Sequence, residues 1–484
     1  MRWAEVAYPR KCPRRKGFLV LRSIKNSNGE GTRKVNATST VERLRVTGGD
    51  RQTVSQAGTH LLGELADRVG LTSSYSAAIS WSGERAFGHD RGRLLAQVAV
   101  MLAAGGRCVA DMAALRDQPD VFGDVASAAT IWRAFDKVDD TVLDGLRAAR
   151  AEARAKAWAA GGIIGEVVLD VDASLVEIHS ERKQGATPHF KRGFGFHPMF
   201  CFLDNSGEAL AGILRPGNAA ANSGADQLVV VEMAIAQLPA EHQRGHQPGD
   251  DPDTVVHPIL VRADSAGAVR GFVDGLVARN CEFSISARVC NALDTAIAAV
   301  ADDAWQPAVN ADGEPRRHAQ VAELDLTVDN WPAGTRAIVR RERPHPGAQL
   351  RLWDHNGMRH QVVLTNSTGD PVTLELRHRR HGQVENRIKN LKDCGLERMP
   401  FTSFAANAAW MEMVLTAADL LAWTQTLLLT GELAVAEPRT LRYRILHIAG
   451  RLIRSARRTW LRLPEHWPWT GDLLDAYRRL AVIT

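Results

Sequence analysis

The stretch IIGEVVLDVDASLV, from Ile163 to Val176, decides the fold class of this 484-residue chain. It is rich in β-branched residues and bounded by glycine, which is typical of a buried strand. Strand-like runs follow at 194–204, 209–215, 257–265 and 281–288, with helical patterns at 223–238 and 266–279. Three strands in succession, then alternating helix and strand, predict an α/β fold with a mixed sheet flanked by helices.

Helical patterning precedes these strands, from about Ser55 to Val138. A helix, a glycine-containing break and a second helix capped by Ser127 resemble a helix-turn-helix, in which Ala128, Thr130 and Arg133 would face DNA. The alternative is an ordinary helical bundle with Trp132 and Phe135 in its core. We predict a helical DNA-binding domain over 51–150, preceded by a basic, weakly ordered arm over 1–50.

The second half of the chain changes character three times. Strand-like runs separated by Gly, Pro and Asn predict an all-β insertion over 301–369. Asp370, Pro371 and Gly395 then bound one long expected helix, weakened locally at Gly382. A further helix is expected at 404–430. The arginine-rich stretch 439–463 predicts a basic amphipathic helix in a C-terminal helical segment, 431–484; it either touches DNA or is a solvated face, and we favour DNA.

The composition limits the class of protein, its compartment and its possible partners. The chain is 45% hydrophobic and carries a formal charge of +5, which suits globular domains and is compatible with a polyanionic partner. Its six cysteines show no metal-finger spacing, so we expect reduced thiols in a cytoplasmic protein. The apolar stretch 411–430 contains Glu412 and Asp419, and is therefore predicted to be a buried helix and not a membrane span.

Carboxylates at strand ends are the first candidate site residues. Asp170 and Asp172 alternate on one strand and so point to the same face, and Asp264 ends a later strand. Buried unpaired charges are costly, and a shared divalent cation would resolve that cost. Oxygen ligands suit Mg²⁺ or Mn²⁺, and two such ions can act on a phosphodiester. Arg262, two residues before Asp264 on the same face, is a possible private partner that would weaken this reading of Asp264.

The stretch RHRRHGQVENRIKNLK, 377–392, holds one acid, Glu385, among basic residues. At helical spacing, His378, His381, Glu385 and Lys392 share a narrow stripe. We therefore expect Glu385 to bind metal and the cations around it to hold DNA, with Arg387, Lys389 and Lys392 in that role. The spacing is not H-E-x-x-H, so we set a zinc site aside.

The order of these motifs resembles that of the DDE transposases of bacterial insertion sequences, which have an RNase H-like fold. The likeness is to the superfamily with an all-β insertion and a Y-x2-R-x3-E-x6-K signature. It spans about Ser55 to Thr430 and is carried by LDVDAS, LRPGN, VRADSAG and VENRIKNLK. In this chain the signature tyrosine and arginine positions are His378 and His381, whose contribution to phosphate binding would depend on pH.

The resemblance implies a catalytic domain over 151–300 and 370–430, with Asp172, Asp264 and Glu385 as metal ligands and Lys392 as the signature lysine. Asp170 is the alternative for the first acid. It implies a nucleoid-associated, cut-and-paste transposase that uses Mg²⁺ or Mn²⁺, as two ions, and cleaves and joins double-stranded DNA at terminal inverted repeats. It also implies a homodimer in the synaptic complex. The alternatives are an RNase H-like nuclease without strand transfer and a decayed DNA-binding regulator.

Overall fold

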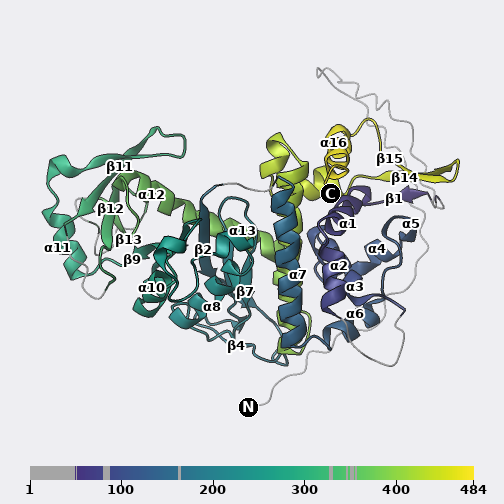
Figure 1. Cartoon of the computed structure of the whole chain (residues 1–484), viewed down its shortest axis with the longest axis horizontal. Helices are drawn as coiled ribbons and strands as arrows, with labels where there is room; N and C mark the ends of the chain where they lie inside the picture. The colour runs from purple at the N-terminus through teal and green to yellow at the C-terminus, as the bar shows by residue number, and fades with distance from the viewer. Residues whose placement is uncertain are drawn as a thin grey trace, which may run out of the picture. The chain divides into compact units, whose positions relative to one another are not determined.

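The stretch that begins at Val167 forms strand β2 (Val167–Ala173), which lies within a nine-stranded sheet in the computed structural model (Figure 1). The structure describes residues 50, 52–79, 88–161, 165–325, 331–344, 347–348, 354 and 357–483, so the expected arm falls outside it except for Asp50. The strand order is β10-β11-β12-β13-β9-β8-β2-β6-β7. Strands β2, β8 and β9 are parallel to one another, and every other neighbouring pair is antiparallel.

The first strands of this sheet match the sequence prediction: β6 (Met199–Leu203), β7 (Ala211–Ile213), β8 (Ile259–Ala263) and β9 (Glu282–Ala287). The expected β insertion supplies the other four: β10 (Gln306–Val309), β11 (Pro315–Leu324), β12 (Arg336–Glu342) and β13 (Arg359–Thr365). These four do not form a sheet of their own, because β13 pairs with β9 from Val362↔Ala287 to Thr365↔Ser284. The predicted insertion also contains the strand-like run AQLRLWD, 348–354, of which residues 349–353 lie outside the described residues.

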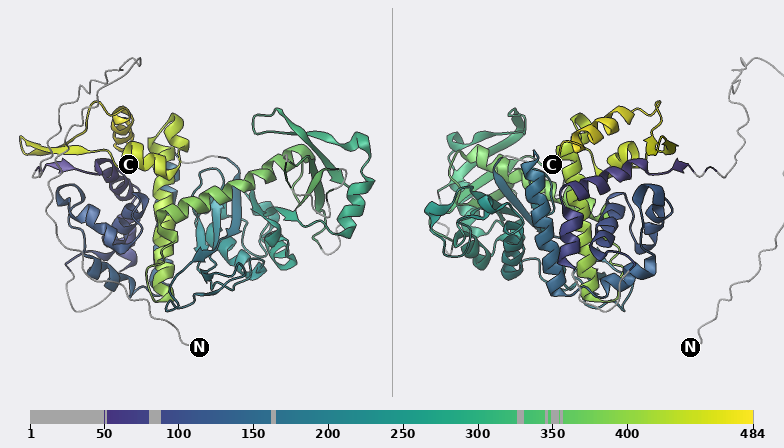
Figure 2. Two further views of the ribbon diagram at one scale, coloured as in Figure 1. Left: turned by 180° about the vertical axis from the view of Figure 1, so that it is seen from behind. Right: turned by 45° about the vertical axis from the view of Figure 1, so that its right-hand side comes forward.

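Side chains alternate between the two faces of the sheet. On one face, Val167, Leu169 and Val171 of β2 share a hydrophobic cluster with helices α8 (Gly224–Ile235) and α10 (Arg270–Val277). The other face carries Asp170 and is covered by helices α12 (Pro371–Arg379) and α13 (Val384–Leu391), which cross it in the left view of Figure 2. The first face is therefore apolar around β2, whereas the second also carries buried charged side chains around Asp170.

Helix α14 (Phe404–Trp423) is the expected buried helix, and it continues into a π-helical turn at Thr424–Leu428. It packs among the N-terminal helices and completes their core. Those helices are α1 (His60–Arg68), α2 (Leu71–Ala78), α3 (Arg91–Ala103), α4 (Ala113–Arg116), α5 (Pro119–Phe122), α6 (Ala128–Phe135) and α7 (Asp140–Ala159). Among the described residues, no helix has the length and apolar character that crossing a membrane requires.

A buried ion-pair cluster joins α7, α14 and the turn between β6 and β7. Arg150 Nη1 lies 2.9 Å from Asp419 Oδ2, Arg154 also contacts Asp419, and Arg154 Nε lies 2.9 Å from Glu208 Oε1. All four side chains are at most 1% exposed. Burial raises the pKa of Asp419, against the pull of the two arginines. The cluster explains why Asp419 can sit in an otherwise apolar helix.

The helix expected over 370–395 forms with a break in the middle. Asp370 caps α12 by accepting from the Thr373 amide, and a 3-10 turn at Arg380–Gln383 surrounds Gly382, the predicted weak point. A π-helical turn, Lys392–Leu396, follows α13 and ends where Gly395 adopts a φ of 97°. This left-handed conformation favours glycine, as the predicted stop requires.

The prediction of a helix over 439–463 is wrong. Only the short helix α15 (Pro438–Leu441) and a π-helical turn, Arg442–Leu446, are helical. The rest is a hairpin of β14 (Gly450–Ser455) and β15 (Arg458–Arg462), and β14 also pairs with β1 (Thr53–Val54). The apolar residues stand in adjacent pairs, Leu452–Ile453 and Trp460–Leu461, between arginines, and the turn contains no glycine, so the sequence lacks both the alternation and the turn signal of a hairpin. Helix α16 (Thr470–Leu480) follows the hairpin.

The remaining elements are short. Strands β3 (Val176–Glu177), β5 (Phe194–Phe196) and β4 (Thr187–Pro188) form a small separate sheet. Helices α9 (Ala240–Gln243) and α11 (Asn291–Ala299) lie in connections between strands. The five described cysteines are free thiols.

Candidate active site

The Asp170 side chain is fully buried, and both of its carboxylate oxygens have hydrogen-bond partners. Arg262 of β8 donates to both of its carboxylate oxygens, from Nε and Nη2, at 2.8 Å each. His381 Nδ1 lies 2.9 Å from Asp170 Oδ1, and Arg387 Nη1 lies 3.2 Å from Oδ2. Burial alone would raise the pKa of Asp170, but the hydrogen bonds from His381 and Arg262 hold the pKa below its ordinary value. Asp170 is therefore a structural anion that ties β2, β8 and α13 together.

These contacts show that Arg262 is not a private ion-pair partner of Asp264. Arg262 binds Asp170 and also lies 3.0 Å from Asp204 Oδ1, so these two acids are its ion-pair partners. Asp170 and Arg262 stand at the same register of the parallel pair β2–β8 and point to one face. The next positions toward the same face are Asp172 in β2 and Asp264, the residue that directly follows β8. The ion pair beneath them thus sets these two carboxylates side by side at the carboxyl ends of the strands.

Asp172 sits in an environment that disfavours its charge. Burial raises its pKa to about 6; the charges of Asp264 and Glu385 add to the rise, whereas the Ala173 amide and His381 oppose it. The Ala173 amide donates to Asp172 Oδ1 at 2.7 Å. Asp264 is exposed and caps a short 3-10 turn, accepting from the Ala266 amide at 2.9 Å. Asp264 and Glu385, from two distant segments, therefore both act electrostatically on Asp172.

Asp172 and Glu385 line one open cavity of about 580 Å³. Lys389 and Lys392 of the same helical segment line it as well, as the predicted stripe requires for Lys392. Lys389 Nζ lies 3.1 Å from Glu437 Oε1. Asp264 is not part of this cavity wall and is linked to it through Asp172.

Two further arginines of the cavity wall were missed by sequence reasoning. Arg107 follows α3 and binds Glu397 at 2.7 Å; Arg439 of α15 binds both oxygens of Asp393, at 2.9 and 2.8 Å. Both come from segments far from Asp172 in the sequence. No motif surrounds them, so only the packing of the N- and C-terminal parts brings them to the cavity.

His378 and His381 have structural partners. His378 is buried, and its two ring nitrogens lie 2.9 Å from the hydroxyls of Ser284 and Ser286. Burial lowers the pKa of His378 to about 3, so the ring is neutral. His381 is turned toward Asp170. His378 is buried and neutral, and serine hydroxyls occupy both of its ring nitrogens, so it is not placed to bind a phosphate.

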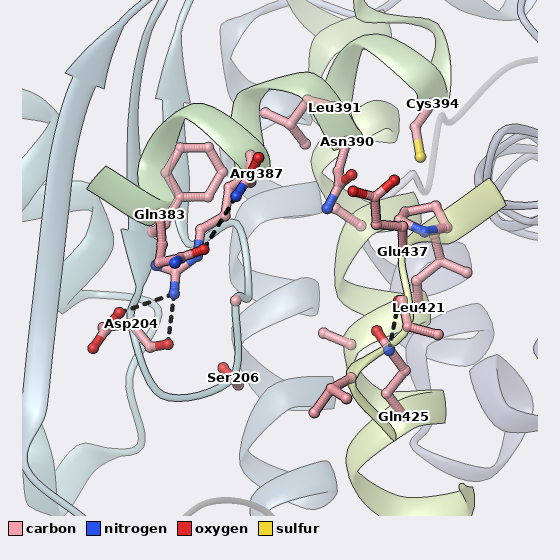
Figure 3. A pocket seen from close by; sticks show the side chains of 18 of the residues that line it. Asp204, Ser206, Gln383, Arg387, Asn390, Leu391, Cys394, Leu421, Gln425 and Glu437 are labelled. Carbon is pink, nitrogen blue, oxygen red and sulfur yellow. Dashed lines mark hydrogen bonds and ion pairs between the residues drawn. The ribbon is translucent and has the colours of Figure 1, made fainter. Parts of the chain in front are cut away.

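Arg387 faces away from Glu385. It lines a second cavity, of about 520 Å³, on another side of α13, where it binds the backbone oxygen of Asp204 at 2.6 Å and the Asp204 carboxylate at 3.0 Å (Figure 3). Gln383, Asn390 and Cys394 line the same cavity. Arg387 thus binds Asp170 and Asp204 on the side of α13 away from Glu385. Lys389 and Lys392 are the cations of this helical segment that lie on the side of Glu385.

Helix α6 carries the other predicted DNA-binding residues. Ser127 caps it by accepting from the Thr130 amide, as expected. Arg133 is exposed and donates to Thr130 Oγ1 at 3.3 Å; both line a cavity of about 450 Å³ with Lys137. Phe135 is buried and stacks on Phe401. The helix therefore has both a core face, as in the bundle interpretation, and an open basic face.

The acids fit a hard cation by their chemistry. All three offer carboxylate oxygens. The pKa of Asp172 is raised first by burial and then by the charges of Asp264 and Glu385, and a bound divalent cation would oppose both effects. Within the described residues, no three His, Cys, Asp or Glu side chains are gathered closely enough to hold a metal ion by themselves. The donors are thus of the right kind, and bringing Asp264 and Glu385 together around Asp172 would need side-chain movement.

The sequence matches a family model over most of its length. A family model described as transposase DDE domain group 1 matches residues 37–484. Among solved structures, the chain is similar to a piggyBac transposase seen by cryo-EM in a synaptic complex with hairpin DNA. That similarity has a TM-score of 0.37 at 9% identity and covers 80% of this chain and 79% of that chain. No curated protein matches the sequence.

Proposed function

Because the chain belongs to the transposase DDE domain group 1 family, we propose that it cleaves and joins DNA at the terminal inverted repeats of an insertion sequence. The reaction would be cut-and-paste: hydrolysis of a phosphodiester, then attack of the freed 3′-hydroxyl on another. The core would be RNase H-like. Its support is the sheet, in which Asp172 lies on the first strand of the series β2, β6, β7, β8, β9 and Asp264 follows the fourth.

Asp172, Asp264 and Glu385 are the proposed catalytic acids. The observation that carries the proposal is the repulsion that Asp264 and Glu385 exert on buried Asp172, at a cavity that Asp172 and Glu385 line together with lysines. They would hold Mg²⁺ or Mn²⁺, as two ions. Such ions activate the attacking oxygen and stabilise the leaving oxygen of a phosphodiester. With its pKa near 6, Asp172 is largely ionised at neutral pH and available as a ligand.

The cations of the cavity would hold the DNA strand. Lys389 and Lys392 follow Glu385 by one and two helical turns and line the same cavity, and Arg107 and Arg439 add two guanidiniums that suit phosphate oxygens. Lys389, Arg107 and Arg439 now bind Glu437, Glu397 and Asp393. A phosphate that replaced these carboxylates would find the cations already positioned. Thr130 and Arg133 of α6 would contact the duplex farther away, and synapsis of two ends would use a homodimer.

A labelled DNA end carrying the inverted repeat tests the proposal. Incubated with Mg²⁺, the protein should nick the end and join it to a second duplex, and Glu385→Gln should abolish both steps. Glu314→Gln, which removes an exposed carboxylate in the turn between β10 and β11, is the matched control and should leave both unchanged.

The two alternatives give different results in the same assay. Cleavage without joining would show a nuclease that does not transfer strands. DNA binding without cleavage, unchanged by Asp172→Ala, Asp264→Ala and Glu385→Ala, would show a decayed regulator. Either result would contradict the proposed transposition reaction.

A further inference from the structure

The hairpin of β14 and β15 is an arginine-rich ribbon that projects beyond the neighbouring helices (Figure 1). Its turn is the pair Ala456–Arg457, with φ values of 50° and 64°. Positive φ at both turn residues is the geometry whose twist matches that of two antiparallel strands. Residues 450–462 contain five arginines and no acid. The ribbon is therefore a regular, strongly cationic element.

The two faces of the ribbon differ. Leu452 and Leu461 lie opposite each other and pack on the core of the helical part, which anchors the ribbon. The opposite face presents three cross-strand pairs: Arg451 with Arg462, Ile453 with Trp460, and Ser455 with Arg458. Trp460 is 56% exposed. A large aromatic side chain in water between arginines is an unusual surface for a free protein.

The charges on this outer face repel one another. Arg451 and Arg462 stand directly opposite, an arrangement that destabilises a strand pair. Arg454, on the inner face, pairs with Asp120 at 2.7 Å. Among the residues that the structure describes, Arg457, Arg458 and Arg462 form no ion pair with a carboxylate. The outer face thus carries a cost that a polyanion would remove.

We propose that this outer face binds duplex DNA, with the ribbon lying in a groove, its arginines on the flanking phosphates and Trp460 against the groove floor. The major groove admits a two-stranded β-ribbon, and arginine is suited to phosphate recognition. The inference rests on the proposed function, since it supplies a DNA contact remote from the acids. It differs from the expected basic helix because the register of the strands selects which arginines face the DNA.

The test measures binding of the full-length protein to a labelled random duplex of about 30 base pairs between about 50 and 300 mM salt, by fluorescence anisotropy. Each lost phosphate contact lowers the slope of log affinity against log salt by about 0.9. The double variant Arg458→Ala, Arg462→Ala should therefore lower that slope by about 2 and weaken binding on the order of tenfold at moderate salt. Trp460→Ala should weaken binding without changing the slope.

Two controls separate DNA contact from folding. Arg458→Lys, Arg462→Lys keeps both charges and should retain the salt slope. Arg478→Ala removes an exposed arginine of α16 that pairs with Asp475, and should bind like the parent. Parental affinity and slope in the double alanine variant would overturn the proposal, as would preference for a single strand of the same length. Failure of the transposase proposal would instead appear as absent cleavage with these binding results intact.

Discussion

Two aspartates on one strand, Asp170 and Asp172, should respond in opposite directions to the same substitution. Burial, with Asp264 and Glu385, raises the pKa of Asp172 from 3.8 to about 6. A pKa difference of one unit between the folded and unfolded protein is worth about 1.4 kcal/mol. The ionised Asp172 carboxylate therefore destabilises the metal-free protein by about 3 kcal/mol. Asp172→Asn should recover up to that amount, since an amide oxygen can still accept from Ala173.

The sign of the pH dependence follows from the raised pKa. The folded protein binds the Asp172 proton more tightly than the unfolded chain does, so the penalty grows as pH rises from 3.8 and is complete above about 6. The gain from Asp172→Asn should be largest near pH 8 and should shrink to about half near pH 5. Mg²⁺ should raise the stability of the parent more than that of the variant.

Asp170→Asn is the matched control and should destabilise. It leaves Arg262 buried without its bidentate partner, a loss of about 3–5 kcal/mol for a buried pair. Urea unfolding at several pH values, followed by fluorescence, measures both variants. A destabilised Asp172→Asn, or a gain from it that ignores pH, would refute the electrostatic account of the site.

Three other outcomes follow from the same contacts. Asp419→Asn should cost about 3–5 kcal/mol of unfolding free energy in urea, because Arg150 and Arg154 lose their shared buried partner; an unchanged midpoint would contradict this. Single-turnover DNA cleavage at low Mg²⁺ should rise with pH as Asp172 ionises around pH 6, and a flat profile across that range would exclude its role as a ligand. Lys392→Ala should lower the salt slope of DNA binding by about 0.9, and Lys392→Arg should restore it; equal slopes for all three proteins would remove Lys392 from the DNA contact.

Local patterns predicted most of the sheet and the covering helices, because strand and cap signals act within a few residues. Asp370, Gly382 and Gly395 mark the start, the break and the end of the helical segment that carries Glu385. The ribbon at 450–462 could not be predicted, because its turn contains neither glycine nor asparagine, the residues that usually signal a hairpin turn. The joining of β13 to β9 escaped because pairing between distant strands leaves no local signal.

In the candidate site, too, local spacing was informative, whereas contacts between distant segments were not predictable. Spacing alone placed Asp170 and Asp172 on one face but could not say which of them is paired. The answer lies in the register of β2 against β8, which sets Arg262 opposite Asp170. Arg107 and Arg439 reach the cavity only through the packing of distant segments. Arg387 and His378 lie near Glu385 in the sequence, yet their contacts point to Asp204 and to Ser284 and Ser286.

Metal-directed cleavage of the protein chain tests the central claim most directly. Fe²⁺ in place of Mg²⁺, with ascorbate and peroxide, generates hydroxyl radicals that cut the backbone beside the bound ion. In the presence of a DNA end, we expect cuts near Asp172, Asp264 and Glu385 together, suppressed by excess Mg²⁺ and lost in Asp172→Asn. Cuts confined to one of these segments, or cuts that persist in Asp172→Asn, would contradict a single site built from the three acids.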